Sequence, residues 1–507
     1  MLAVFQIFIA GPSQDERRPP RGAAIRAAAE RGGDFLKRGR REATLTSVAV
    51  LATLVVGCGQ APRVADVAAA MDSAFTVQGA GGTAIARVLT RAATCPAIAW
   101  DGATPTPMLE RVAPARVPPR SGEQSDSKAA DFPVRVCEAP WPAHAQSAHV
   151  AGVTLPAPAR NIQRITIVAD TGCRMKGSEN AFQACNDATA WPFARVAVQA
   201  AATKPDLVIH IGDMHYRESP CPTGNAGCAN SPWGYGYDVW KADFFQPARP
   251  LLTSAPWVFV RGNHESCSRA GQGWLRFFDL QPWSEQRSCN APQWDAQGDF
   301  SPPYAVPLSR DAQLVVFDSA ATAGKPLKPT DAAYAPYVAQ MGDVARLAAQ
   351  APTSFFLSHH PVLAFAPSKK SGAVNPGNAG LQSVMALTEP QRLFPRGIDV
   401  AMHGHVHLFE ALSFSSPHPA TLVLGNSGSD NLWDRSLPKT LPANAAPYPG
   451  AVVEDFATTF EYGFATLDRE DPQDASRWLL TEYNADGKPT IRCRIHQGKS
   501  RCTPVTP

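Results

Sequence analysis

Hydrophobic residues recur between positions 161 and 430 as short uninterrupted runs. Such runs are typical of strands that are buried on both faces of a sheet. Two longer segments, residues 188–204 and 332–352, carry the spacing of helices. Strands that alternate with helices predict an α/β domain over 161–430. The runs predicted as strands are RITIVAD (164–170), DLVIHIGD (206–213), PWVFVRGNHE (256–265), LVVFDS (314–319), SFFLSHH (354–360), IDVAMHGHVH (398–407) and TLVLGNSG (421–428).

The regions on either side of this domain have a different texture. FTVQG, AIARVL, PAIAW and FPVRVCE predict short strands, so residues 58–160 are expected to form a small β domain with a long loop at about 105–130. After a Pro-rich stretch, the segments EYGFATLDR and WLLTEYNADGKPTIRCRI predict further strands, with a hairpin turn at NADGK. Residues 431–507 are therefore interpreted as a strand-rich C-terminal extension.

Residues 1–57 have the character of a leader. A basic stretch ending at Arg41 precedes the apolar run ATLTSVAVLATLVVG, which is typical of an export signal and short for a membrane span. The sequence VVGC at 55–58 resembles the lipobox of bacterial lipoproteins, which implies acylation of Cys58. The alternative is a buried N-terminal helix that contains a cysteine. We expect an exported protein of the periplasm or cell envelope, attached to the membrane only through a lipid anchor.

The cysteine content agrees with export. The chain has eleven cysteines, and setting Cys58 aside leaves ten, which is an even number. Oxidising compartments favour disulfides, and the absence of a CxxC spacing argues against a zinc ribbon. We expect neighbouring cysteines to pair, although an even count does not fix the connectivity. The expected pairs are Cys95–Cys137, Cys173–Cys185, Cys221–Cys228, Cys267–Cys289 and Cys493–Cys502.

Composition adds little. The chain is 44% hydrophobic and 18% charged, as in ordinary soluble proteins, and its net charge of +3 gives no reason to expect a nucleic-acid groove. Oligomeric state is left open.

Polar side chains follow most of the predicted strands. In open α/β sheets the carboxyl ends of the strands meet at one edge, so these side chains are expected to converge there. Their mixture of carboxylate, amide, phenol and imidazole does not suit a structural zinc site, which prefers Cys and His. It suits two cations that share one carboxylate. The residues are Asp170, Asp213, Tyr216, Asn263, His264, His359, His405 and His407.

Five blocks carry a family resemblance. DTG at Asp170, GDMHY at Asp213, GNHE at Asn263, LSHHP at His359 and GHVH at His405 occur in the order found in calcineurin-like metallophosphoesterases. The resemblance implies a four-layer α/β/β/α sandwich and a binuclear metal centre. Most members have Asp-x-His in the first block, and this chain lacks that histidine.

Tyr216 resembles the compensating ligand of the purple acid phosphatase branch. There a phenolate binds ferric iron, a hard cation that favours an anionic oxygen donor. By resemblance, the first ion is Fe(III), and the second is a divalent Zn, Mn or Fe ion. The ligands implied are Asp170, Asp213, Tyr216 and His407 for the first ion, and Asp213, Asn263, His359 and His405 for the second.

The reaction implied is hydrolysis of a small-molecule phosphomonoester by attack of a metal-bound hydroxide on phosphorus. His264 would act on the phosphate or the leaving group as general acid or electrostatic partner. The alternatives are a phosphodiesterase or nucleotidase with the same centre, or an envelope binding protein with a vestigial site.

Several residues keep two interpretations at this point. Asp170 could be a helix N-cap, and Tyr216 could merely pack beside the site. His360 competes with His359, and His403 and His215 are not expected to bind metal. Arg261 and Arg269 could bind phosphate or form ion pairs, and Asp318 is expected to be structural. Aromatic residues in 221–240 and 267–278 could rim the metal cleft or pack inside.

Overall fold

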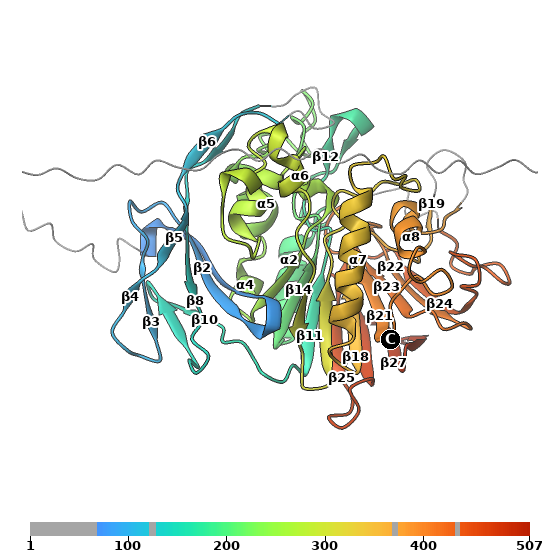
Figure 1. Cartoon of the computed structure of the whole chain (residues 1–507). Helices are drawn as coiled ribbons and strands as arrows, with labels where there is room; N and C mark the ends of the chain where they lie inside the picture. The colour runs from blue at the N-terminus through green and yellow to red at the C-terminus, as the bar shows by residue number, and fades with distance from the viewer. Residues whose placement is uncertain (1–67, 121–127, 368–373, 431–436, 507) are drawn as a thin grey trace, which may run out of the picture. The chain divides into compact units, whose positions relative to one another are not determined.

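The structure, a computed structural model, describes residues 68–506 apart from 121–127, 368–373 and 431–436 (Figure 1). The VVGC segment with Cys58 lies outside the described residues. Within the described part of the chain, no helix combines the length and the apolar character that crossing a bilayer requires.

The first sheet has eleven strands in the order β28-β27-β26-β25-β11-β14-β15-β1-β2-β8-β5. Its centre is the parallel set β11, β14 and β15, which confirms the first three predicted strands. The bounds are β1 Met71–Gln78, β2 Ala84–Thr90, β5 Leu109–Val112, β8 Arg135–Pro140, β11 Arg164–Val168, β14 Leu207–Ile211, β15 Trp257–Val260, β25 Gly463–Arg469, β26 Trp478–Asn484, β27 Pro489–His496 and β28 Lys499–Pro504.

The second sheet has seven strands in the order β16-β17-β18-β21-β23-β22-β24. The strands β17, β18, β21 and β23 run in parallel and correspond to the remaining predicted runs. The bounds are β16 Tyr304–Pro307, β17 Ala312–Val316, β18 Thr353–Leu357, β21 Ile398–His403, β22 Phe409–Phe414, β23 Ala420–Leu424 and β24 Val453–Thr459.

The two sheets pack face to face, with helices on their outer faces (Figure 1). The central strands β14, β15, β17, β18 and β23 are buried along their whole length, because each lies between a helix layer and the other sheet. The four-layer sandwich is therefore confirmed. The inter-sheet core includes Ile165, Ile209 and Val258 from the first sheet and Leu314, Phe355 and Val400 from the second.

Both predicted helices are present. The helix α2 (Phe193–Ala202) buries Phe193, Val196, Ala197 and Ala200 against the first sheet, a spacing that gives one apolar face. The helix α7 (Tyr334–Ala348) packs on the second sheet with α8. Further α-helices of the described residues are α3 Tyr237–Trp240, α4 Arg249–Leu252, α5 Gly271–Phe277, α6 Asp295–Gly298 and α8 Ala379–Met385.

The N-terminal strands join the first sheet. β1 pairs in parallel with β15 at Val77 and Trp257, and β2, β8 and β5 continue from it. A smaller sheet, β10-β9-β3-β4, lies in the same segment. The domain boundary at residue 160 stays a prediction. The expected long loop is wrong in part, because it contains short paired strands. Within the expected loop lie β4 Thr106–Pro107, β5, β6 Ala115–Val117 and the first residue of β7 Ala130–Phe132. The smaller sheet also contains β3 Ala97–Trp100, β9 Ala148–Val150 and β10 Val153–Leu155.

The C-terminal segment supplies strands to both sheets. β25 to β28 form the opposite edge of the first sheet, and β24 forms an edge of the second. The NADGK turn joins β26 to β27, with the amide N–H of Asn484 donating to the carbonyl oxygen of Lys488 at 2.9 Å. All five expected disulfides are present.

Candidate metal centre

The predicted site residues converge at one edge of the sandwich. Asp170, Asp213 and Asn263 each follow one of the adjacent parallel strands β11, β14 and β15. His359 follows β18 in the second sheet, and His405 and His407 follow β21 beside it. Both sheets contribute to the set, which explains why residues far apart in sequence meet.

The first cluster surrounds the hydroxyl group of Tyr216. This oxygen lies 2.8 Å from Oδ1 of Asp170, 2.9 Å from Oδ2 of Asp213 and 2.9 Å from Nε2 of His407. The ring of Tyr216 is almost fully buried. These are the four residues expected to hold the first ion.

The second cluster contains Asp213, His359 and His405, whose potential ligand atoms lie within 4.8 Å of one another. Nε2 of His359 is 3.1 Å from Oδ2 of Asp213. The side-chain oxygen of Asn263 lies 3.2 Å from Nε2 of His359 and 3.1 Å from Nδ1 of His405. These are the four residues expected to hold the second ion.

Asp213 belongs to both clusters through a single oxygen. Its Oδ2 atom is 2.9 Å from the Tyr216 hydroxyl and 3.1 Å from Nε2 of His359. Burial opposes its ionisation, but the charges of His359 and His264 hold the pKa of Asp213 well below its usual value. An ionised carboxylate between two ligand clusters is the group that can bridge a pair of cations.

The cluster around Tyr216 suits a cation, because it holds more hydrogen-bond acceptors than protons to share among them. The phenol of Tyr216 has one proton, yet it faces two carboxylate oxygens and an imidazole nitrogen at 2.8–2.9 Å. Burial and then the charges of Asp170 and Asp213 raise the pKa of Tyr216 well above its usual value. Burial alone would lower the pKa of His359, but Asp213 raises it to about 9. The centre thus attracts positive charge strongly.

The backbone at the centre is strained. Asp170, Asp213 and His405 have φ values of 55°, 57° and 73°, which side-chain-bearing residues seldom adopt. Such conformations persist where the surrounding structure enforces them, and they cluster at functional sites. Gly262 is required by close approach, because a Cβ atom there would lie 2.1 Å from Oδ1 of Asp213.

Two buried carboxylates that the sequence analysis left without a role hold these loops. Glu265, in the GNHE block, accepts backbone N–H bonds from Asp213, Met214, His215 and Gly262 at 2.8–3.1 Å. Asp243 accepts the N–H of Tyr216 at 2.9 Å. Glu265 could have been suspected from its block. Asp243 lies in a separate segment, and its sequence carries no signal.

Residues 163–409 match the family model described as calcineurin-like phosphoesterase. The chain contains a calcineurin-like phosphoesterase domain. It is accordingly a metal-dependent phosphoric ester hydrolase. None of the curated proteins matches the chain.

Three solved structures are similar to this phosphoesterase. Purple acid phosphatase PPD1 from yellow lupin (Lupinus luteus) seeds is 16% identical, with 85% of this chain and 74% of that chain covered and a TM-score of 0.49. A structure of PhoD is 11% identical, with 86% and 92% covered and a TM-score of 0.47. A dimetal phosphatase from Danio rerio is 12% identical, with 68% and 100% covered and a TM-score of 0.35.

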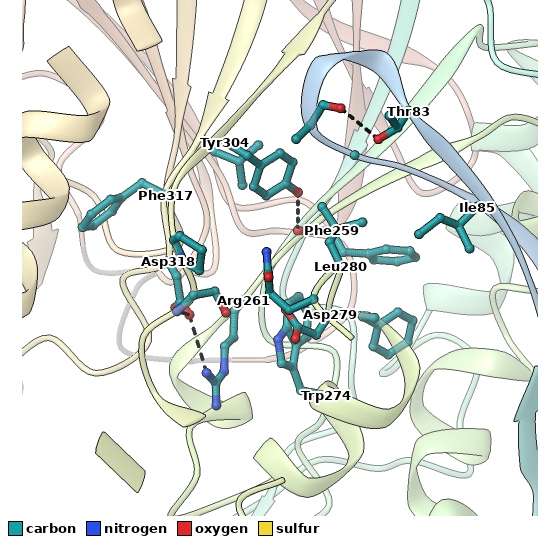
Figure 2. A pocket seen from close by; sticks show the side chains of 17 residues that line it. Thr83, Ile85, Phe259, Arg261, Trp274, Asp279, Leu280, Tyr304, Phe317 and Asp318 are labelled. Carbon is teal, nitrogen blue, oxygen red and sulfur yellow. Dashed lines mark hydrogen bonds and ion pairs between the residues drawn. The ribbon is translucent and has the colours of Figure 1, made fainter. Parts of the chain in front are cut away.

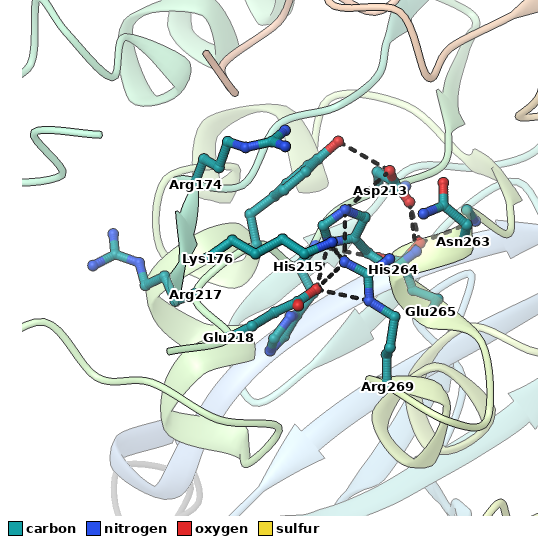
Figure 3. A network of polar contacts seen from close by, with 12 residues as sticks. Arg174, Lys176, Asp213, His215, Arg217, Glu218, Asn263, His264, Glu265 and Arg269 are labelled. Carbon is teal, nitrogen blue, oxygen red and sulfur yellow. Dashed lines mark hydrogen bonds and ion pairs between the residues drawn. The ribbon is translucent and has the colours of Figure 1, made fainter. Parts of the chain in front are cut away.

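His264 of the phosphoesterase lies in a polar network beside the centre (Figure 3). Its ring centroid is 4.0 Å from that of Tyr216, and its Nδ1 atom is 2.7 Å from a carboxylate oxygen of Glu218. Arg269 contacts both His264 and Glu218. For Arg269 the alternatives were phosphate binding and an ion pair, and the structure shows an ion pair with Glu218. Burial and the charge of Arg269 lower the pKa of His264 to about 4, which favours its neutral ring.

A cavity of about 370 Å³ opens onto the centre. It is lined by the metal-ligand candidates Asp213, Tyr216 and Asn263 and by His264. Three charged residues that sequence reasoning missed also line it, namely Arg174, Lys176 and Glu179. Their signal was weak, because a basic pair after the DTG block has no fixed place in the motif set.

The competing histidines lie outside the two ligand clusters. Nδ1 of His360 is 3.1 Å from the Ser319 hydroxyl, and Nδ1 of His403 is 3.0 Å from the Ser358 hydroxyl. Nε2 of His215 donates to the carbonyl oxygen of Gly234 at 2.8 Å. Their polar contacts are with the surrounding protein.

Arg261 and Asp318 line a different cavity from the one at the metal centre. They lie 3.5 Å apart at the wall of a cavity of about 180 Å³ that is lined mainly by apolar side chains such as Phe259 and Trp274 (Figure 2). Arg261 also donates to the carbonyl oxygen of Glu265 at 2.7 Å. It thus supports the GNHE turn from behind and does not line the metal cavity.

The aromatic residues of 221–240 and 267–278 were expected either to rim the metal cleft or to pack inside. The first alternative is wrong for the residues named below. Tyr235, Tyr237 and Trp240 are buried, as are Trp274 and the phenylalanines beside it. They belong to the core under the first sheet, because large aromatic surface is stabilised most by burial.

Proposed function

We propose that the chain hydrolyses phosphomonoesters at a binuclear metal centre. The first ion, Fe(III), is assigned to Asp170, Asp213, Tyr216 and His407, and the second, a divalent Zn, Mn or Fe ion, to Asp213, Asn263, His359 and His405. The observation that carries the proposal is the position of Asp213 Oδ2, within 2.9 Å of the Tyr216 hydroxyl and 3.1 Å of Nε2 of His359.

Bound cations would supply Lewis-acid activation of water and neutralise charge on the phosphoryl oxygens. Asp213 and Asp170 provide the negative charge that retains them. Tyr216 would provide an oxygen donor that suits a hard trivalent ion, because such a cation stabilises the anionic form of a phenol.

His264 is assigned to the leaving group. Its ring lies over Tyr216 and lines the cavity, so it can reach a substrate oxygen from the protein side. Nδ1 lies 2.7 Å from a carboxylate oxygen of Glu218, and Nε2 lies 2.8 Å from a guanidinium nitrogen of Arg269 and 3.9 Å from Oδ2 of Asp213. The group can stabilise the developing alkoxide by a hydrogen bond or by proton donation.

The proposal includes export and a lipid anchor at Cys58. The five disulfides support an oxidising compartment, since a reducing cytosol does not maintain them. Mass spectrometry of the membrane fraction of expressing cells tests the anchor. Acylated Cys58 supports it, and a chain released without modification contradicts it.

The enzymatic part is tested by metal analysis of the purified chain together with a substrate panel. The panel contains p-nitrophenyl phosphate, its bis-ester and several nucleotides. We expect about two metal ions per chain, with iron among them, and fastest turnover of the monoester. Preference for the bis-ester or for nucleotides would favour the alternative activities. Absence of both metal and hydrolysis would favour a binding protein.

A further inference from the structure

A short hairpin carries Arg174 and Lys176, the two positively charged side chains that line the metal cavity. Its strands are β12 (Met175–Lys176) and β13 (Ala181–Phe182), joined by the turn Gly177–Glu179. Arg174 and Lys176 are two residues apart and share one side of the strand. Met175 between them faces the opposite way, into a small core with Cys173 and Cys185.

This hairpin is fixed to the segment that carries Tyr216. The backbone N–H of Met175 donates to the carbonyl oxygen of Tyr216 at 3.0 Å, and the N–H of Glu218 donates back to Met175 at 3.0 Å. The N–H of Gly177 donates to the Ser219 hydroxyl at 2.8 Å. The Cys173–Cys185 disulfide closes the hairpin. The segment that carries Arg174 and Lys176 therefore has a fixed position relative to the metal centre.

The head groups are held at the cavity wall by Glu179. One carboxylate oxygen is 2.5 Å from Arg174, and the other is 3.1 Å from Nζ of Lys176. Only 10% of the Arg174 side chain and 8% of the Lys176 side chain is exposed. Withdrawing two cations this far from water is costly, so a purely structural role would be better served by apolar residues.

Lys176 stands on the His264 side of the cavity, and Glu179 joins its ammonium group to the guanidinium group of Arg174. Lys176 extends toward His264, and Arg174 runs in the same direction (Figure 3). Neither belongs to the two ligand clusters around Asp213. Because His264 is assigned to the leaving group, Lys176 lies where the leaving-group part of a substrate would be, and Arg174 is joined to it through Glu179. Guanidinium and ammonium groups bind phosphate and carboxylate through charge-assisted hydrogen bonds.

We infer that Arg174 and Lys176 recognise a second anionic group, a phosphate or a carboxylate, on the leaving-group part of the substrate. The centre is then selective for small phosphomonoesters that carry two anionic groups. A cavity of about 370 Å³ suits a compact molecule of this kind. For its reaction, this inference rests on the proposed function of the metal centre.

The test compares pairs of substrates in which one member carries an added anionic group. In the carboxylate arm, 4-carboxyphenyl phosphate is compared with phenyl phosphate. In the phosphate arm, propane-1,3-diyl bisphosphate is compared with propyl phosphate. The quantity measured is the ratio of kcat/KM within each pair, for the wild type and for variants. The arm whose ratio falls in the variants identifies the anionic group.

The variants are Lys176→Gln and Arg174→Gln. Each should lower the ratio about tenfold, since one charge-assisted hydrogen bond is lost, and should leave turnover of the singly charged partner nearly unchanged. Lys176→Arg should keep most of the preference. The matched controls are Lys241→Gln, whose Nζ lies 3.1 Å from Asp72, and Arg195→Gln, whose guanidinium lies 3.1 Å from Asp486. Both should leave the ratio unchanged.

Calorimetric binding of propane-1,3-bisphosphonate and propylphosphonate makes the test independent of turnover. Tighter binding of the bisphosphonate, lost in Lys176→Gln, supports the inference even if no phosphoester is hydrolysed, in which case the proposed function fails alone. Equal binding of both compounds overturns the inference. So does an equal loss of turnover on both members of a pair, which would place the cations on the scissile phosphate.

Discussion

The hydroxyl oxygen of Tyr216 lies 2.8 Å from Oδ1 of Asp170, although 46 residues separate the two in the chain. Asp170 begins the DTG block, which lacks the histidine usual in the resembling family. The next strand of the sheet brings a phenol to the ligand cluster around Asp170. The departure in one block is thus matched by a donor from another.

Replacing Tyr216 by Phe tests the ferric assignment. A phenolate bound to Fe(III) gives a visible charge-transfer band, so aerobically purified wild type should be coloured. Tyr216→Phe should lose the band and part of the iron while retaining some metal. Tyr337→Phe is the control, because that buried tyrosine lies on α7 and bonds to the N–H of Ala321. A colourless wild type that contains only zinc or manganese would contradict the iron and leave the hydrolase intact.

Removing the shared carboxylate should reduce the metal content of the chain. Asp213→Ala should abolish binding of at least one ion, because one oxygen of Asp213 belongs to both ligand clusters. Metal content per chain, measured by plasma mass spectrometry, reports the loss. Asp206→Ala is the control at the other end of the same strand, where the carboxylate accepts the N–H of Gln163 at 2.7 Å. A variant at Asp213 that keeps two ions would remove this residue from the bridge.

His264→Ala separates catalysis from metal binding. His264 lines the cavity and lies outside the two proposed ligand clusters, so the variant should retain both ions and lose turnover by about 10²–10⁴-fold, as is usual for general acid–base groups. Single-turnover rates and metal content are measured on the same preparation. Wild-type rates with full metal would exclude His264 from the mechanism.

The residues that converge at the centre could be anticipated because they follow predicted strands. Asp170, Asp213 and Asn263 end three neighbouring strands, and parallel strands bring their carboxyl ends to one edge. The pairing of β1 with β15 could not be anticipated. Strand partners across long sequence separations depend on which edge is left uncovered, and the short apolar runs of the N-terminal segment do not encode that.

The contacts that support the metal-site residues could not be predicted from the sequence either. Asp243 reaches Tyr216 from a helix that has no motif, and the hairpin of Arg174 and Lys176 faces the cavity only because of its backbone bonds to Tyr216 and Glu218. Aromatic residues near a ligand loop have no signature that separates a cleft rim from a core. In this chain burial decided their place, since the first sheet offers a large apolar face.

Glu265→Gln should loosen the loop of Asp213. The carboxylate of Glu265 accepts four backbone N–H bonds, and an amide would direct its own N–H₂ group at some of those donors. We expect a loss of about 3 kcal/mol in the free energy of unfolding, measured with urea, and weaker metal binding. Glu285→Gln, on an exposed turn, is the control. Unchanged stability and metal affinity would show that Glu265 does not hold the loop.

Glu482 should make stability fall as pH rises. It is buried in β26 and accepts a hydrogen bond from Asn426 at 2.7 Å, but burial raises its pKa well above the ordinary value of 4.5. The folded state then binds more protons than the unfolded state between those two pKa values, so the free energy of unfolding decreases with pH across that window. The contribution is fully present below the unfolded pKa and is lost as pH rises through the folded pKa.

Glu482→Gln removes the titrating group, so its unfolding free energy should decline less than that of wild type between about pH 5 and pH 8. Urea unfolding at several pH values measures the slopes, with Glu470→Gln as the exposed control. Equal slopes in wild type and Glu482→Gln would show that the carboxyl group of Glu482 titrates normally in the folded chain.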